Sequence, residues 1–212
     1  MIDKVHAIIG TVLACTLSFA GGTAAADALF KFDRGIGSQP LRAGPSGAPP
    51  VANLVAGVAP GGAPWPIETL IAEIGYDGRI RATVQGLVLG GTDNIGSRGG
   101  ARQMVISLFC RNPPAPGTAV GTLQAVPYNS EPVQLDPDGN FNLDSTITNA
   151  NGGTPQAACG DSADNRPVLL VRTLVPANAN TGTPATPGAW FAAGVLKSTS
   201  DNGHKGRGVH DR

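Results

Sequence analysis

The sequence predicts an all-β protein, a single antiparallel β-sandwich of the Ig-like or jelly-roll-like type with long loops rich in glycine and proline. The 30 glycines and 18 prolines among 212 residues break helices and supply turns. Between these turns, several short apolar stretches alternate apolar with polar residues, as strands with one buried face do. The sequence contains no convincing amphipathic helix and no internal repeat. A small β-barrel is the alternative architecture, because barrels are built from the same short strands.

The first strand is expected at 28–33, where alternation buries Phe30 and Phe32. The following segment, 35–66, carries many glycines and prolines and is predicted to be an irregular loop with a short strand around 51–58. Trp65 lies between two prolines, so it cannot occupy a central strand. We expect its side chain to cover one end of the core.

Two Asp-Gly pairs predict β-hairpins. Asp77-Gly78 separates 67–74 from 79–89, and the second arm alternates buried with exposed positions. Asp-Gly is the preferred pair of a type I′ turn, in which both central residues have positive φ. The second pair, Asp138-Gly139, separates two short apolar segments, 132–135 and 141–146.

Further strands are expected at 103–110, 119–126, 168–174 and 190–196, and the third of these reads as a continuous apolar run typical of a central strand. These elements place the β-sandwich domain at 27–197. The remaining residues, 198–212, are polar and lack an apolar pattern, which predicts a disordered tail.

The first 26 residues have the layout of a secretory signal peptide. A charged start precedes an apolar run over 7–20 and an Ala-x-Ala cleavage site at Ala24 and Ala26. A membrane span needs about 20 predominantly apolar residues, so no transmembrane segment is expected in the mature chain. We therefore expect a bacterial protein that begins at Asp27 and is secreted or periplasmic. Lipid anchoring at Cys15 is the alternative.

The charge balance excludes one class of partner. Acidic and basic residues number 15 each, and the formal net charge is zero. Capture of nucleic acid or of an acidic membrane surface needs concentrated basic charge, which this chain lacks. We expect the partner to be a protein or a glycan at the cell envelope.

The expected export of the chain determines how its cysteines are interpreted. Cys15 lies in the expected signal peptide, so the mature chain keeps Cys110 and Cys159. Two cysteines in an exported protein most simply form one disulfide, and their spacing differs from the C-x-x-C of redox pairs. We predict a structural disulfide between them.

The histidine inventory argues against familiar catalysis. The three histidines are His6, His204 and His210, so the body of the mature chain contains none. Nucleophile activation by histidine and the common zinc sites need positioned histidines or cysteine clusters. We therefore predict no metal, no cofactor and no catalytic residue of these kinds.

Carboxylate pairs are the catalytic route that remains. Glycoside hydrolysis uses two acids that face each other across a cleft. Glu68 and Glu73 are an odd number of positions apart and point to opposite faces of a regular strand. Asp161 and Asp164 lie in a loop beside Cys159. Activity as an enzyme thus stays an open alternative, with a polysaccharide hydrolase as its form.

Two loops were candidates for ligand binding. The stretch 136–144 is rich in Asp and Asn, but its glycine lies at position four rather than six of a calcium loop, which favours a plain β-turn. In 91–102, glycines let backbone amides approach a ligand, and two arginines could clamp a carboxylate or sulfate. The candidate ligand-binding residues of this loop are Asp93, Asn94, Arg98 and Arg102.

The sequence as a whole favours an exported, non-enzymatic β-sandwich protein that binds a partner, glycan or envelope surface through its loops. A carboxylate-dependent hydrolase acting on polysaccharide is the first alternative. A structural component of the envelope without a small-molecule site is the second.

Overall fold

The computed structural model describes residues 28–112, 114–118, 121–155, 159 and 165–197. The expected signal peptide, Cys15, the three histidines, the loop aspartates at 161 and 164 and the expected tail at 198–212 lie outside these residues.

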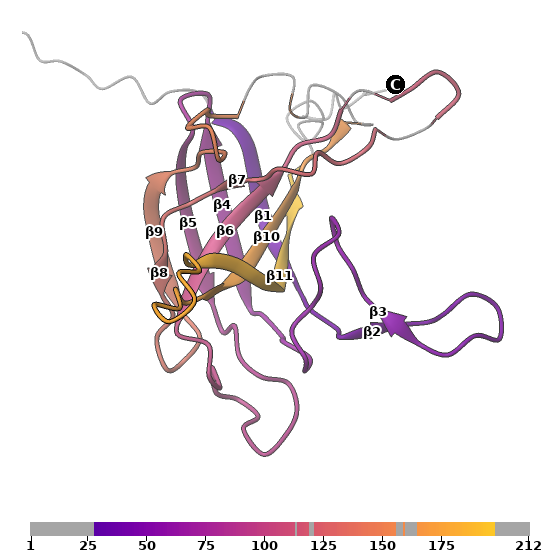
Figure 1. Cartoon of the computed structure of the whole chain (residues 1–212), viewed down its shortest axis with the longest axis vertical. Coiled ribbons are helices and arrows are strands. Elements are labelled where there is room, and N and C mark those ends of the chain that lie inside the picture. The colour runs from indigo at the N-terminus through magenta and orange to yellow at the C-terminus, as the bar shows by residue number, and fades with distance from the viewer. Residues whose placement is uncertain (1–27, 113, 119–120, 156–158, 160–164, 198–212) are drawn as a thin grey trace, which may run out of the picture.

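The protein is all-β, as predicted. Its main sheet is antiparallel throughout, in the order β7-β6-β10-β11-β1-β4-β5-β9, with β8 also paired to β6. The strands of this sheet are β1 (Ala28–Gly37), β4 (Thr69–Gly75), β5 (Arg79–Gln85), β6 (Gln103–Phe109), β7 (Tyr128–Asn129), β8 (Val133–Gln134), β9 (Phe141–Thr146), β10 (Val168–Val175) and β11 (Thr186–Leu196). A separate ribbon pairs β2 (Leu41–Arg42) with β3 (Val51–Ala52). It projects away from the main sheet (Figure 1).

The main sheet curls so that its two ends meet (Figure 1). Asn129 of β7 and Thr148, just after β9, exchange two backbone hydrogen bonds of 2.8 and 3.0 Å. This curled form is consistent with both predicted architectures, the sandwich and the barrel. The contact also brings residues from the two ends of the sheet together.

The concave side of the sheet holds the main core. In β4 and β5, alternate residues are fully or almost fully buried, as the period-two pattern predicted. Phe30, Phe32 and Trp65 belong to the same core. The Trp65 ring stacks on Phe191 with centroids 4.1 Å apart and an interplanar angle of 9°. Burying these apolar surfaces supplies the main driving force for folding, at about 25 cal/mol per Å².

The outer side of β6, β10 and β11 is also covered. Phe109, Leu170 and Trp190 form a second apolar cluster there, and Val55 and Val58 from the 38–66 segment pack against it. The Trp190 indole N–H donates to the Asn53 carbonyl oxygen at 3.2 Å. Burial on both faces explains why β6 and the first half of β10 read as continuous apolar runs.

The first predicted hairpin is confirmed, but its turn type was wrong. β4 and β5 pair antiparallel through Ile74 and Ile80. Gly78 has φ of 79°, whereas Asp77 has no positive φ. The Gly78 N–H donates to the Gly75 carbonyl oxygen at 3.0 Å, which closes a three-residue connection. This is the hairpin in which a type I turn is followed by a left-handed glycine.

The second Asp-Gly pair forms a turn, but its flanking strands do not form the expected two-stranded ladder. β8 pairs with β6, whereas β9 pairs with β5 at the other end of the sheet. The strand expected at 119–126 is reduced to a bridge between Arg111 and Leu123 within the described residues. The positions of β8 and β9 are therefore set by their pairing with β6 and β5, and not by the turn that joins them.

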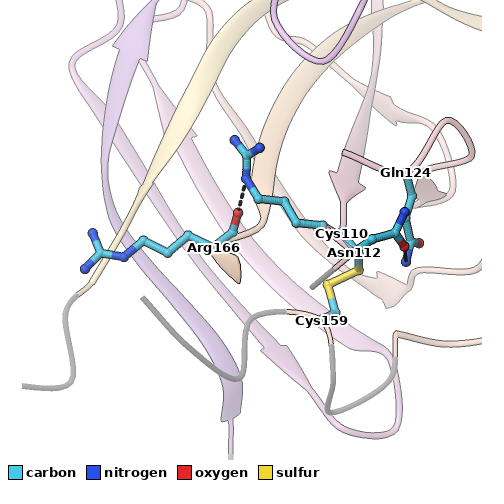
Figure 2. The surroundings of a disulfide bond; sticks show 6 residues. Cys110, Asn112, Gln124, Cys159 and Arg166 are labelled. Atoms are coloured by element: carbon cyan, nitrogen blue, oxygen red, sulfur yellow. Dashed lines mark hydrogen bonds between the residues drawn. A yellow bond between two sulfur atoms is a disulfide. The ribbon is translucent and has the colours of Figure 1, made fainter. Parts of the chain in front are cut away.

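The predicted disulfide between Cys110 and Cys159 is present, and Figure 2 shows it at the end of β6. Both cysteines are almost completely buried. Nearby, the Arg111 Nε–H donates to the Arg166 carbonyl oxygen at 2.9 Å (Figure 2). Within the described part of the chain, no helix is long and apolar enough to cross a membrane.

Candidate functional site

The predicted Gly-rich loop is a compact series of turns. The Leu89 N–H donates to the Ser97 carbonyl oxygen at 2.7 Å, and the Ser97 hydroxyl donates to the Asn94 carbonyl oxygen at 2.7 Å. Asp93 and Asn94 are exposed. Much of the backbone hydrogen-bonding capacity of this loop is therefore used within the loop itself.

The two arginines of that loop have different surroundings. The Arg98 Nη1–H donates to the Leu135 carbonyl oxygen and so holds the loop against the β8–β9 connection. Arg102 is exposed and lines a hollow of about 470 Å³ together with Gln103, Gln134 and residues 173–176. Asp93, Asn94 and Arg98 do not line this hollow.

A second hollow, which we call the Arg172 hollow, lies where the two ends of the sheet meet. It has a volume of about 510 Å³. Its polar lining is Asn129, Ser130, Glu131, Thr148, Asn149 and Arg172, and the rest consists of small apolar residues at 125–127, 150 and 187. The bridge between Asn129 and Thr148 fixes the relative positions of its two walls.

Arg172 lies on the outer face of β10, two residues after Leu170 of the outer apolar cluster. Its side chain is half-buried and makes three hydrogen bonds. Nε–H donates to the Gly188 carbonyl oxygen at 2.8 Å, Nη2–H to the Pro187 carbonyl oxygen at 2.6 Å, and Nη1–H to the Ser107 hydroxyl at 3.4 Å. Partial burial lowers the pKa of the Arg172 guanidinium from its ordinary value.

No carboxylate of the described residues forms an ion pair with Arg172. A guanidinium has five N–H donors and stays charged in proteins. Because three donors are used by neutral oxygens, two remain for a ligand. A partly desolvated cation with spare donors is a favourable partner for an anion.

Two asparagines extend this set of donors. Asn129 Oδ1 accepts from the Ser107 hydroxyl at 2.6 Å, which leaves its Nδ2 group without a partner among the described residues. Asn149 Oδ1 accepts from the Asn151 and Gly153 N–H groups, both at 2.9 Å. These two hydrogen bonds fix the orientation of the Asn149 amide, whose Nδ2 group makes no hydrogen bond with another described residue.

Sequence reasoning missed Arg172. The segment 168–174 reads as a continuous apolar run, but Arg172 interrupts it. A charged residue inside an otherwise apolar strand was the available signal, because buried charges need partners and cluster at functional sites. Asn129 of β7 and residues 148–149 after β9 carry no comparable signal, since only the fold brings them to Arg172.

The two acids that line one hollow, Glu73 and Asp144, are held in ion pairs. Glu73 and Asp144 both line a shallow hollow of about 410 Å³ on the outer face of β4, β5 and β9. Glu73 lies 3.1 Å from the Lys31 amine, and Arg79 holds Asp144 through two hydrogen bonds of 2.9 and 2.8 Å. The hydrogen bond from Arg79 lowers the pKa of the Asp144 carboxyl. A general acid needs the opposite shift.

The described residues contain no group of three or more histidine, cysteine, aspartate or glutamate side chains placed to hold a metal ion. The stretch 136–144 forms the β-turn favoured by its spacing. Asp136 Oδ1 accepts from the N–H groups of Asp138 and Asn140, at 2.9 and 2.8 Å.

Comparisons of this chain with protein-family models, with curated proteins and with solved structures find no match.

Proposed function

We propose that the protein is an exported, non-enzymatic β-protein that binds a partner, glycan or envelope surface, and that the Arg172 hollow is its binding site. One observation carries this proposal: Arg172 is half-buried, its hydrogen-bond acceptors are all neutral, and two of its donors remain. A spare, partly desolvated guanidinium in a concave site favours ligand recognition.

Binding is preferred over hydrolysis because of the state of the acids. A glycosidase needs one carboxyl that keeps its proton near neutral pH and a second, ionised one. Asp144 has its pKa lowered, and Glu73 is engaged by Lys31. In the other two hollows described above, the lining residues contain no pair of acids.

Export is the second part of the proposal, and it rests on the signal-like residues 1–26 and on the disulfide. Expression of the full chain in a bacterial host with an intact export pathway tests it. We expect the mature protein outside the cytoplasm with Asp27 as its first residue, read by intact mass and N-terminal sequencing. An uncleaved cytoplasmic chain, or an acylated Cys15, would contradict this processing.

The binding site is tested with a pair of matched variants. Asn129→Asp keeps the acceptor for Ser107 but removes the Nδ2 donors and places a carboxylate beside Arg172. Asn142→Asp is the control, because Asn142 Oδ1 likewise accepts from a hydroxyl across two strands, Thr83 at 3.0 Å, but outside the hollow.

Arrays of glycans and peptides, probed with the exported wild type and both variants, give the readout. We expect at least one class of ligand to be retained by the wild type and by Asn142→Asp, and lost by Asn129→Asp. A structural envelope component would retain no ligand from either array. Ligands retained equally by all three proteins would place the binding site elsewhere.

A further inference from the structure

We propose that the ligand of the Arg172 hollow is an acidic sugar, bound through its carboxylate to Arg172. This inference rests on the proposed binding function and adds the chemical class of the ligand. Sugars of this class share a carboxylate flanked by hydroxyl groups, as in a uronic acid residue.

The charge of the hollow selects the anion. Arg172 is the one cationic side chain among the described residues of the lining, and its hydrogen-bond partners are two backbone carbonyl oxygens and the Ser107 hydroxyl. Its planar guanidinium matches a carboxylate better than a point charge does, because two N–H groups can face two oxygens. Glu131 is exposed and forms no ion pair with Arg172. Glu131 thus lines the hollow without neutralising the guanidinium through direct contact.

The other polar side chains of the hollow are suited to bind the hydroxyl groups of a sugar. Asn129 and Asn149 present Nδ2 donors, and Thr148 adds a hydroxyl that can both donate and accept. These side chains come from β7 and from the residues after β9, and the bridge between Asn129 and Thr148 holds them together. Sugar hydroxyls, which donate and accept at short spacing, use such a mixed set well.

The size and the apolar lining favour a sugar over a peptide terminus. The volume of about 510 Å³ falls within the range of small-molecule sites. The apolar lining consists of small residues, chiefly alanine and proline, and it offers no deep pocket for a peptide side chain. A peptide carboxylate would engage Arg172, and peptide carbonyls could accept from the asparagine amides, but a peptide terminus lacks the closely spaced hydroxyl groups of a sugar.

Isothermal titration of the full, exported chain tests this assignment with three probes: an oligosaccharide that contains glucuronate, the matched oligosaccharide with glucose in its place, and a short peptide with a free C-terminal carboxylate. We expect the acidic oligosaccharide to bind at least tenfold more tightly than the other two. Its affinity falls as salt is added, because a charge pair forms on binding.

Two substitutions of opposite sign locate the contact. Asn129→Asp is expected to weaken the acidic oligosaccharide at least tenfold, whereas Asn142→Asp leaves its affinity unchanged. Glu131→Gln removes a negative charge at the rim, keeps an acceptor oxygen, and is expected to strengthen binding about twofold to threefold at low salt. Thermal midpoints measured on the same samples separate lost binding from lost folding, and Glu131→Gln lies at an exposed position.

Each contrary result would overturn a specific part of this proposal. Equal affinity for the acidic and neutral oligosaccharides, or tighter binding of the peptide, overturns the acidic sugar but leaves the Arg172 hollow as a binding site. Unchanged affinity in Asn129→Asp overturns the hollow itself. Absence of binding by all three probes overturns the ligand class, while the arrays still decide whether the protein binds through this site.

Discussion

Asp136 shows how a single exposed carboxylate organises the turn before β9. Its two oxygens accept hydrogen bonds from the backbone of Asp138 and from the backbone and side chain of Asn140. The hydrogen bond from the Asn140 backbone is the largest cause that lowers the pKa of the Asp136 carboxyl. A carboxyl whose pKa is lowered by folding stabilises the folded state above its unfolded pKa. That contribution is lost as the pH falls through the folded pKa.

Asp136→Asn should therefore destabilise the protein at neutral pH, and its effect should shrink as the pH falls toward the lowered pKa of the wild-type carboxyl. Urea unfolding at about pH 7 and about pH 2.5 measures both differences. Asp138→Asn is the control, because that carboxylate makes no hydrogen bond with another described residue. An equal loss of stability at both pH values would mean that the charge of Asp136 is irrelevant to the turn.

At the scale of elements, the turn at Gly139 joins β9 to the end of β5. The Leu87 N–H donates to the Gly139 carbonyl oxygen at 2.9 Å. Gly139 has φ of 81°, and a Cβ atom there would lie 2.4 Å from the Leu87 carbonyl oxygen. Both the backbone conformation and the close approach therefore require glycine at this position.

Two substitutions separate these requirements. Gly152 has nearly the same conformation, with φ of 77°, but a Cβ there would meet nothing within 4 Å. Gly152→Ala should cost about 1 kcal/mol, the strain of a left-handed alanine. Gly139→Ala should cost about 2 kcal/mol more, because the clash with the backbone of Leu87 forces β5 and β9 apart. Equal losses of unfolding free energy in denaturant would show that the close approach is relaxed without cost.

Much of this element structure could be predicted from local sequence. Alternation defined β4 and β5, an apolar run defined β10, and Asp-Gly pairs marked both turns, because these signals act within one or two strands. The turn type depended on a three-residue connection that Asp-Gly alone does not specify. The location of β8 depended on β6, and the Arg172 hollow depended on residues far apart in the chain. Such long-range pairings leave no local pattern.

At the scale of the whole molecule, the disulfide encloses the part of the chain that closes the sheet. The segment between Cys110 and Cys159 spans 49 positions and contains β7, β8 and β9, which lie at the two ends of the strand order. Within it, Asn129 and Thr148 join those ends. Cross-linking this segment reduces the conformational entropy of the unfolded chain. In the chain-entropy model this raises the free energy of unfolding by about 4 kcal/mol.

Replacing both cysteines, as Cys110→Ser with Cys159→Ser, should lower the free energy of unfolding by about 2–4 kcal/mol and leave a single transition. A single transition is expected because one continuous sheet carries the main core, so no part of it can unfold and leave the rest closed. Thermal unfolding of the wild type with and without reductant, beside the double variant, measures the effect. Reductant should lower the wild-type midpoint and leave that of the variant unchanged. A wild-type midpoint that does not move would show that the closed sheet, held by contacts such as that between Asn129 and Thr148, is stable without the cross-link.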